Sequence, residues 1–226
     1  MARELNFGHR AARSGQARSM VVFLHGYGAD GADLLGLADP LAPHLPDTVF
    51  VAPDAPERCT GNPQGFQWFA IPWLDGSSEA AAAAGLQASA ADLNGFLDAR
   101  MRAEKLTARQ VAIVGFSQGS MLALHVLPRR ADRFAGIVAF SGKMLHPETL
   151  AGEALSKPPV LLVHGDQDPV VPFAEMPAAG QALTAAGFET YAHVMKGTGH
   201  GIAPVGLSVA LAFLRDRLGQ SVSGSD

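Results

Sequence analysis

The stretch Val111-Ala-Ile-Val-Gly-Phe-Ser-Gln-Gly-Ser-Met-Leu-Ala-Leu124 decides how this chain folds. It opens with a β-branched apolar run typical of a buried strand and closes with helix-forming residues. Between them, Gly115-Phe-Ser-Gln-Gly119 fits G-x-S-x-G, the pattern of a serine on a sharp strand-to-helix turn. Small neighbours allow such a tight turn, and the following helix directs its N-terminal amides at the same point. We therefore expect Ser117 to be a nucleophile.

The pattern alone is weak evidence, because a chain with 25 glycines in 226 residues offers many chances for it. An unreactive serine in an ordinary glycine-rich turn is the alternative. The strand before Ser117 and the helix after it favour the nucleophile, because the pattern has this meaning only between those two elements.

The composition restricts the class of protein. At 48% hydrophobic residues the chain can bury a sizeable core, and its length suits one large domain or two small ones. The formal net charge of −4 gives no basic field for nucleic acid. No apolar run reaches the length of a membrane-spanning helix, so stable membrane insertion is not expected.

The single cysteine, Cys59, excludes an internal disulfide framework and fits a reducing compartment. Residues 1–19 contain arginines but no apolar core of a secretory signal. We therefore expect a cytoplasmic protein.

Apolar runs alternate with helical patterns along the chain, which is typical of a parallel sheet covered on both faces. The sequence thus predicts an α/β fold with a mostly parallel central sheet, helices on both faces and a single domain. Residues 1–19 form a polar N-terminal segment or edge strand, 20–218 the domain, and 219–226 a disordered tail. The expected strands are 20–24, 48–52, 111–114, 134–140, 160–163 and 189–194, and the clearest helices are 77–105, 173–186 and 204–218.

Residues 53–76 read as a long ordered loop rich in proline and glycine, and such loops are usually functional. Trp68, Phe69 and Trp73 within it are candidate contacts for a hydrophobic substrate. The alternative is that these aromatic side chains attach the loop to the body of the protein. A third reading makes them the interface of a homodimer.

A serine hydroxyl needs a base within hydrogen-bond reach and a group that orients the base. Asp168 and Asp166 both follow the strand at 160–163, and the rigid Pro169-Val-Val-Pro172 turn favours Asp168. The alternative role for either is to cap a turn.

Among the 8 histidines, His200 lies between glycines after the last strand, where a loop can approach the serine closely. His25 and His164 also follow strands, but they precede Asp168 and break the order Ser, Asp, His. We expect these two to be structural imidazoles bonded to the backbone.

An oxyanion hole combines the amide after the nucleophile with one from a loop after an early strand. Gln118 and Tyr27 occupy those positions. The alternative is that the glycines around Tyr27 merely turn the chain. The sequence contains no H-E-x-x-H and no Cys/His cluster with metal-ligand spacing, so no metal site is expected.

With these motifs in this order, the chain resembles the phospholipase/carboxylesterase family of α/β-hydrolases, which includes bacterial carboxylesterases and acyl-protein thioesterases. The resemblance covers residues 20–218. It implies Ser117 as nucleophile, Asp168 as orienting acid and His200 as base, oxyanion amides at Tyr27 and Gln118, and no cofactor.

The resemblance implies a serine carboxylesterase that hydrolyses small-molecule esters of short to medium chain length through an acyl-enzyme. An acyl-protein thioesterase or lysophospholipase acting on longer chains is the alternative, and a non-catalytic binder of hydrophobic ligands is a third. The family commonly shows Leu where this chain has Tyr27, and an acid where it has Ala70. The acyl preference therefore cannot be transferred.

Overall fold

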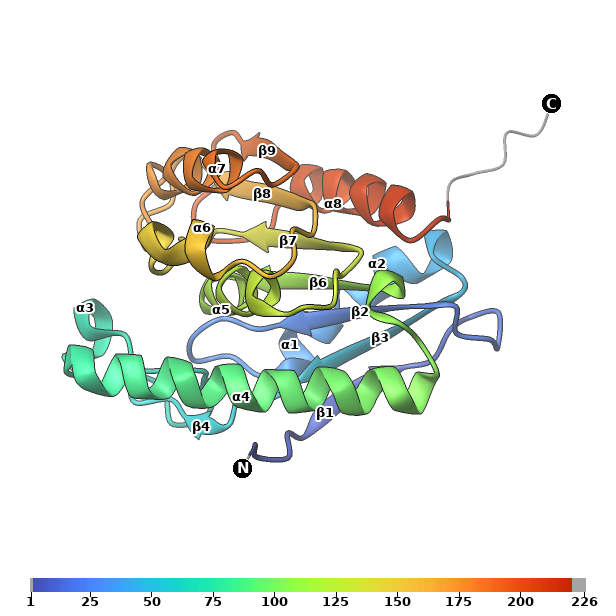
Figure 1. The fold of residues 1–226 in the computed structure, drawn as a ribbon, viewed down its shortest axis with the longest axis horizontal. Helices are drawn as coiled ribbons and strands as arrows, with labels where there is room; N and C mark the ends of the chain where they lie inside the picture. Colours follow the sequence, from blue (N-terminus) through green and yellow to red (C-terminus); the bar gives the residue numbers. More distant parts are fainter. Residues whose placement is uncertain (1, 221–226) are drawn as a thin grey trace.

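The computed structural model describes residues 2–220 and contains a seven-stranded sheet between two layers of helices (Figure 1). Only β1 runs antiparallel, against β3, and the other pairings are parallel. This confirms the predicted fold class. In spatial order the strands are β1 (Phe7–Arg10), β3 (Thr48–Pro53), β2 (Ser19–Leu24), β6 (Val111–Phe116), β7 (Gly136–Phe140), β8 (Val160–Gly165) and β9 (Thr190–Met195).

Two hydrophobic clusters, one on each face of the sheet, hold the helices in place. One face is covered by α4 (Glu79–Glu104), α5 (Gln118–Val126), α6 (Leu150–Glu153) and α7 (Glu175–Ala185). The opposite face is covered by α1 (Gly31–Leu35), α2 (Ala38–Leu41) and α8 (Pro204–Arg217). Single 3₁₀ turns lie at Ala42–His44, Ala108–Gln110, Leu127–Arg129 and Pro147–Thr149.

Strand β2 shows why the strands read as unbroken apolar runs. Successive side chains of a strand point to opposite faces of the sheet. Met20, Val22 and Leu24 enter one cluster, whereas Val21 and Phe23 enter the other. Both faces of the strand are therefore buried, and its sequence does not alternate between polar and apolar residues.

The long helix α4 begins where the sequence predicts. The Ser78 hydroxyl caps it by accepting a hydrogen bond from the Ala81 amide at 3.1 Å. Leu86, Leu93 and Leu97 pack its inner face against the sheet. In Figure 1 this helix runs along the lower side of the molecule.

The stretch 53–76 is more structured than a loop. It contains a two-stranded hairpin, β4 (Glu57–Arg58) with β5 (Phe66–Gln67), and the short helix α3 (Pro72–Asp75). None of the helices within 2–220 combines the length and the apolar character needed to cross a membrane.

The two ends of the chain differ in how they match the predictions. Within residues 1–19, expected as a polar segment or an edge strand, the structure has the strand β1 at the edge of the sheet. The disordered tail was expected to begin at Gly219, but the Gln220 side chain donates to the hydroxyls of Ser19 and Thr48, each at 2.8 Å. Gln220 is thus attached to the strands. The rest of the predicted tail, 221–226, lies outside the described residues.

Candidate active site

Ser117 lies on the turn between β6 and α5 in a strained backbone conformation, with φ 51° and ψ −114°. Two glycines permit this turn. A Cβ on Gly119 would lie 1.9 Å from the Leu24 carbonyl oxygen, and one on Gly115 would lie 2.5 Å from the Ser120 amide. The helix start therefore packs directly on the end of β2, which only glycine allows.

Asp168 and His200 form the hydrogen bond that a general base requires. The carboxylate Oδ2 of Asp168 accepts from Nδ1 of His200 at 2.7 Å. Because a carboxylate only accepts, the proton must lie on Nδ1. Nε2 of His200 is then free to take up a proton, which is the tautomer a serine nucleophile needs.

The Asp168 carboxylate is held by four polar groups and is fully buried. Its Oδ1 accepts from the amides of Val170 and Val171, each at 2.9 Å, and the His164 ring lies 3.3 Å from Oδ2. Burial raises the pKa of Asp168, but the hydrogen bonds from His200 and the two amides more than offset this and leave the pKa below its ordinary value. The carboxylate therefore stays ionised beside His200.

Asp166, the rival acid, is placed elsewhere. Its side chain is exposed and accepts from the Gly197 amide at 2.7 Å. It is therefore a turn-capping residue, and it leaves Asp168 as the acid that contacts His200.

The base lies beside the nucleophile's turn. The ring of Phe116, which immediately precedes Ser117, lies 4.9 Å from the His200 ring between centroids. Ser117 follows β6, Asp168 follows β8 and His200 follows β9, so all three lie at the carboxyl edge of the parallel strands. Sites of open α/β sheets form at this edge.

Two amides are available for an oxyanion. The Gln118 amide is in the first turn of α5 and has no partner within the helix. The loop with Tyr27 lies against the nucleophile, because a Cβ on Gly26 would be 3.4 Å from that of Ser117. The Gly28 amide already donates to a β5 carbonyl at 2.9 Å, whereas no acceptor within residues 2–220 pairs with the Tyr27 amide.

His25 and His164 are structural, as expected. Nδ1 of His25 donates to the Gly26 carbonyl at 2.8 Å, and its Nε2 accepts from the Ala55 amide at 2.9 Å. Burial lowers the pKa of His25, so it remains a neutral brace for its loop. Nε2 of His164 donates to the Val171 carbonyl at 2.9 Å and supports the turn that holds Asp168.

The three aromatic candidates have different positions. Trp68 is fully buried, and its indole donates to the His25 carbonyl at 3.0 Å. A fully buried ring cannot make the substrate contact expected from the sequence. The ring instead attaches the loop to the body of the protein. Phe69 is buried but lines a groove, whereas Trp73 is 57% exposed.

The Gln118 side chain has a role that sequence reasoning missed. Its Oε1 accepts from the Trp68 amide at 2.9 Å, and its Nε2 donates to the Phe69 carbonyl at 2.6 Å. The residue after the nucleophile thus also anchors the aromatic segment. No local sequence pattern predicts a contact between Trp68 and Gln118, because they are 50 positions apart.

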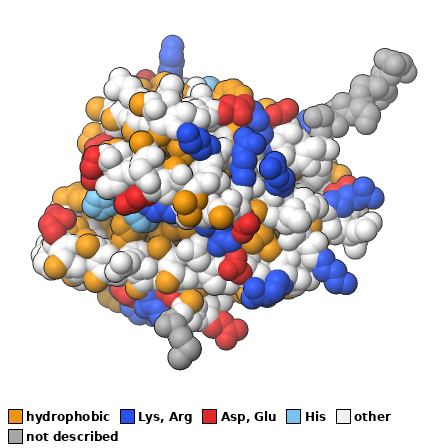
Figure 2. Space-filling view, viewed as in Figure 1, with side chains coloured by type: hydrophobic (Ala, Val, Ile, Leu, Met, Phe, Trp, Pro, Cys, Tyr) orange, Lys and Arg blue, Asp and Glu red, His pale blue; other side chains and the backbone are white. Residues whose placement is uncertain are grey.

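A groove of about 520 Å³ lies close to the nucleophile's turn. Lys143 lines this groove, and a Cβ on the preceding residue, Gly142, would lie 3.3 Å from the Ser117 carbonyl oxygen. Hydrophobic and histidine side chains line a hollow above α4 in Figure 2. The groove is lined by Phe69, Ala70, Pro72 and Trp73 from one segment, Lys143 to Pro147 from the segment after β7, and Glu79, Ala82, Ala83 and Leu86 from α4.

Comparison with known proteins identifies the family. The model of the phospholipase/carboxylesterase family matches residues 11–218. The chain belongs to this family. It is 27% identical to esterase YpfH of Escherichia coli strain K12 over 88% of this chain and 83% of the relative. It is 33% identical to acyl-protein thioesterase 1 of Eremothecium gossypii, with 92% of each protein covered.

A solved structure of esterase PE8 has the same fold. It superposes with a TM-score of 0.90 at 43% identity and covers 95% of this chain and 100% of that one. As a member of the phospholipase/carboxylesterase family, the chain is a serine hydrolase of esters with an α/β-hydrolase fold. This membership argues against the non-catalytic alternative.

Proposed function

We propose that this family member is a carboxylesterase that cleaves short- to medium-chain esters with Ser117, His200 and Asp168. One observation carries the proposal. The Asp168–His200 hydrogen bond of 2.7 Å fixes the tautomer of a base whose ring packs against the residue before Ser117. A strained serine, an oriented base and a buried acid together support acyl transfer.

In the first half of the reaction, the Ser117 Oγ attacks the ester carbonyl carbon as its proton passes to Nε2 of His200. Asp168 stabilises the resulting imidazolium. The carbonyl oxygen becomes an oxyanion that the Tyr27 and Gln118 amides bind, and each such donor contributes about 10²- to 10³-fold in rate. The intermediate collapses, the C–O bond to the alcohol breaks, and His200 returns the proton to the leaving oxygen.

In the second half, water attacks the acyl-enzyme and its proton passes to Nε2 of His200. The same two amides hold the second oxyanion. Collapse breaks the bond to Ser117, which regains the proton, and the carboxylic acid leaves. The chemistry needs no metal or redox group.

A thioesterase or lysophospholipase acting on longer chains is the second candidate. The acyl-protein thioesterase relative and the apolar groove favour it. The same three residues would serve, because a thioester differs only in its leaving group. Rates on oxygen esters and thioesters of matched chain length distinguish the two. The cytoplasmic location and the homodimer remain predictions from the sequence.

The test is hydrolysis of p-nitrophenyl esters from acetate to palmitate by wild type and Ser117→Ala. We expect turnover to peak at short or medium chains and kcat to fall by about 10⁴-fold or more in the variant. Ser208→Ala is the control, because that residue is exposed on α8 and, among residues 2–220, its hydroxyl bonds only the Pro204 carbonyl. A Ser117→Ala protein with most of the wild-type rate would contradict the proposal.

A further inference from the structure

Helix α3 forms the outer wall of the groove and carries the exposed Trp73. Asp75 accepts hydrogen bonds from two backbone amides of its own segment. Oδ2 of Asp75 accepts from the Ile71 amide and Oδ1 from the Ser77 amide, each at 2.9 Å. These bonds shape the wall, but they do not fix it to the rest of the protein.

The Tyr27 hydroxyl makes that attachment. It donates to Oδ2 of Asp75 at 3.2 Å and accepts from the Gly61 amide at 3.2 Å. Within the described chain, the Tyr27–Asp75 bond is the one hydrogen bond that links residues 71–76 to a distant segment. The Tyr27 hydroxyl thus supplies the hydrogen bond that attaches the wall to another part of the protein, in addition to the packing of Ile71 in the core.

The second attachment of α3 crosses the groove. The Lys143 ammonium lies 4.4 Å from the centroid of the Trp73 ring, within the range of a cation–π contact. Lys143 follows Gly142, which packs against Ser117, and Tyr27 belongs to the loop with the oxyanion amide. Both attachments thus come from segments that touch the nucleophile, so the wall is set relative to the reacting atoms.

The charges favour the Tyr27–Asp75 bond. Burial raises the pKa of Tyr27, so the hydroxyl keeps its proton and remains a donor. Burial raises the pKa of Asp75, but hydrogen bonds from Ser77, Ile71 and Tyr27 outweigh it and lower the pKa. A neutral hydroxyl thus donates to an ionised carboxylate, which is stronger than a bond between neutral groups.

We propose that the Tyr27 hydroxyl and Asp75 are a positioning pair that holds α3 in place as the groove wall and so determines how well longer esters bind. The inference rests on the proposed esterase function and adds a specificity determinant to it. An acetyl group is too short to fill a groove of this size, whereas longer chains contact the wall. Loosening α3 should therefore raise the KM of longer esters more than that of acetate.

The test is the p-nitrophenyl ester series with Tyr27→Phe, which removes the hydroxyl and keeps both the ring and the backbone amide. Loss of one hydrogen bond to a charged group corresponds to about a tenfold change in an equilibrium. We expect the KM of the longest hydrolysed esters to rise about tenfold more than the KM of acetate. The ratio of kcat between long and short esters should stay the same.

Asp75→Ala removes the other partner together with the hydrogen bonds from the Ile71 and Ser77 amides, so it should give a selective rise at least as large. The double variant Tyr27→Phe/Asp75→Ala should match Asp75→Ala alone, because the hydroxyl has already lost its acceptor. Additive effects of the two changes would contradict a direct pair.

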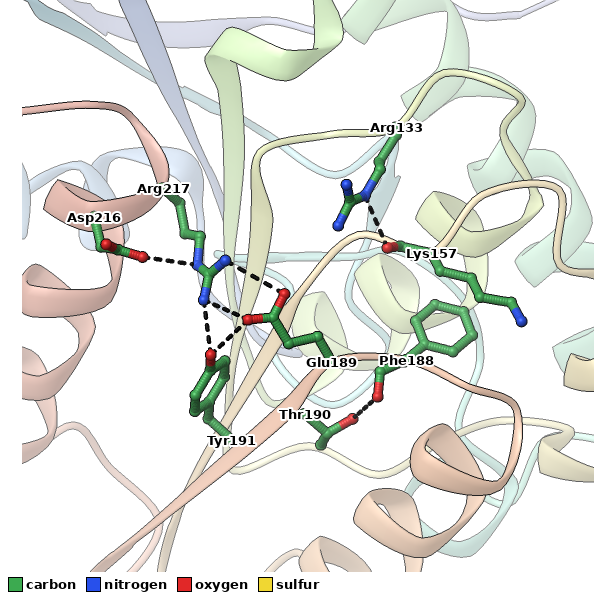
Figure 3. A network of polar contacts seen from close by, with 8 residues as sticks. All are labelled: Arg133, Lys157, Phe188, Glu189, Thr190, Tyr191, Asp216 and Arg217. Atoms are coloured by element: carbon green, nitrogen blue, oxygen red, sulfur yellow. Dashed lines mark hydrogen bonds and ion pairs between the residues drawn. The ribbon is translucent and has the colours of Figure 1, made fainter.

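Tyr191→Phe is the matched control, since Tyr27 and Tyr191 are the only tyrosines. The Tyr191 hydroxyl also donates to a carboxylate, that of Glu189 at 2.5 Å, and accepts from Arg217 at 2.8 Å. Figure 3 shows this network, which joins β9 to the last turn of α8. Its loss should leave KM and kcat unchanged for every ester.

Fluorescence provides a readout that does not depend on activity. The two tryptophans are Trp68, which is buried, and Trp73, which is exposed on α3. Time-resolved anisotropy should show faster motion of Trp73 in Tyr27→Phe and no change in Tyr191→Phe. Unchanged anisotropy, or an equal change in KM for all esters, would overturn the positioning pair while leaving the esterase proposal intact. A wild type inactive on every ester would refute the esterase proposal, and the anisotropy result would then decide on the pair.

Discussion

Asp168 determines which nitrogen of His200 carries the proton. In Asp168→Asn, the side-chain oxygen can still accept from the Val170 and Val171 amides, which turns the amide NH₂ group toward His200. The NH₂ group donates to Nδ1 of His200, so the ring proton moves to Nε2. Nε2 then cannot accept the proton of Ser117. We expect kcat at neutral pH to fall by about 10⁴-fold with the fold preserved, which steady-state kinetics and circular dichroism will check.

Asp166→Asn is the control for this change. Asp166 is exposed, and its only described hydrogen bond is with the Gly197 amide, which an asparagine oxygen also accepts. The variant should keep the wild-type rate. A large loss there, with little loss in Asp168→Asn, would exchange the roles of the two acids. In wild type the low pKa of Asp168 keeps it charged at neutral pH, and its support of His200 is lost only as the pH falls through that pKa.

At the scale of single residues, the sequence could predict the parts of the candidate site that stand in a recognisable turn after a strand. Ser117 lies between Gly115 and Gly119, Asp168 precedes a proline-flanked turn, and His200 lies between two glycines. The Tyr27–Asp75 bond could not be predicted, because its partners are 48 positions apart and no local pattern connects them. The burial of Trp68 could not be predicted either, since the residue type alone does not determine whether an aromatic side chain in a loop faces the core or the solvent.

At the scale of elements, the packing of α5 against β2 is the contact that shapes the turn at Ser117. In Gly119→Ala the new Cβ would lie 1.9 Å from the Leu24 carbonyl oxygen, which belongs to rigid backbone. We expect a loss of about 3 kcal/mol in the free energy of unfolding. At roughly 2–4 °C per kcal/mol for a chain of this size, thermal unfolding should show a fall in Tm of about 6–12 °C.

Gly152→Ala is the matched control, because a Cβ on that helical glycine of α6 would meet no atom within 4 Å. Its Tm should stay the same or rise slightly, since alanine favours the helix. A Gly119→Ala protein as stable as Gly152→Ala would contradict the close packing of α5 on β2.

Long elements were predictable from sequence and short ones were not. Strands buried on both faces and the capped helix α4 extend over enough residues for a pattern to emerge. The strands β4 and β5 have two residues each and α3 has four, which is too short for any periodicity. Because α3 forms a wall of the groove, the groove side of the candidate site was the least predictable part.

At the scale of the whole molecule, a site assembles from segments far apart in the chain because parallel strands end at a common edge. Residues after β2, β6, β7, β8 and β9 all meet there, between the two layers of helices (Figure 1). The order of the motifs along the strands therefore indicates which residues lie at this edge. The contour of the groove depends on side-chain packing across the whole fold and needed the structure.

The central claim is that Ser117 is the nucleophile of a working esterase. A fluorophosphonate probe reacts with a serine only when its base and oxyanion donors are in place. We would label the folded wild-type protein and locate the modified peptide by mass spectrometry. We expect a single adduct on Ser117 that a hydrolysable ester competes away and that is absent from Asp168→Asn under the same brief exposure. Folded protein that takes up no probe, or takes it up on another residue, would rule out Ser117 as the nucleophile.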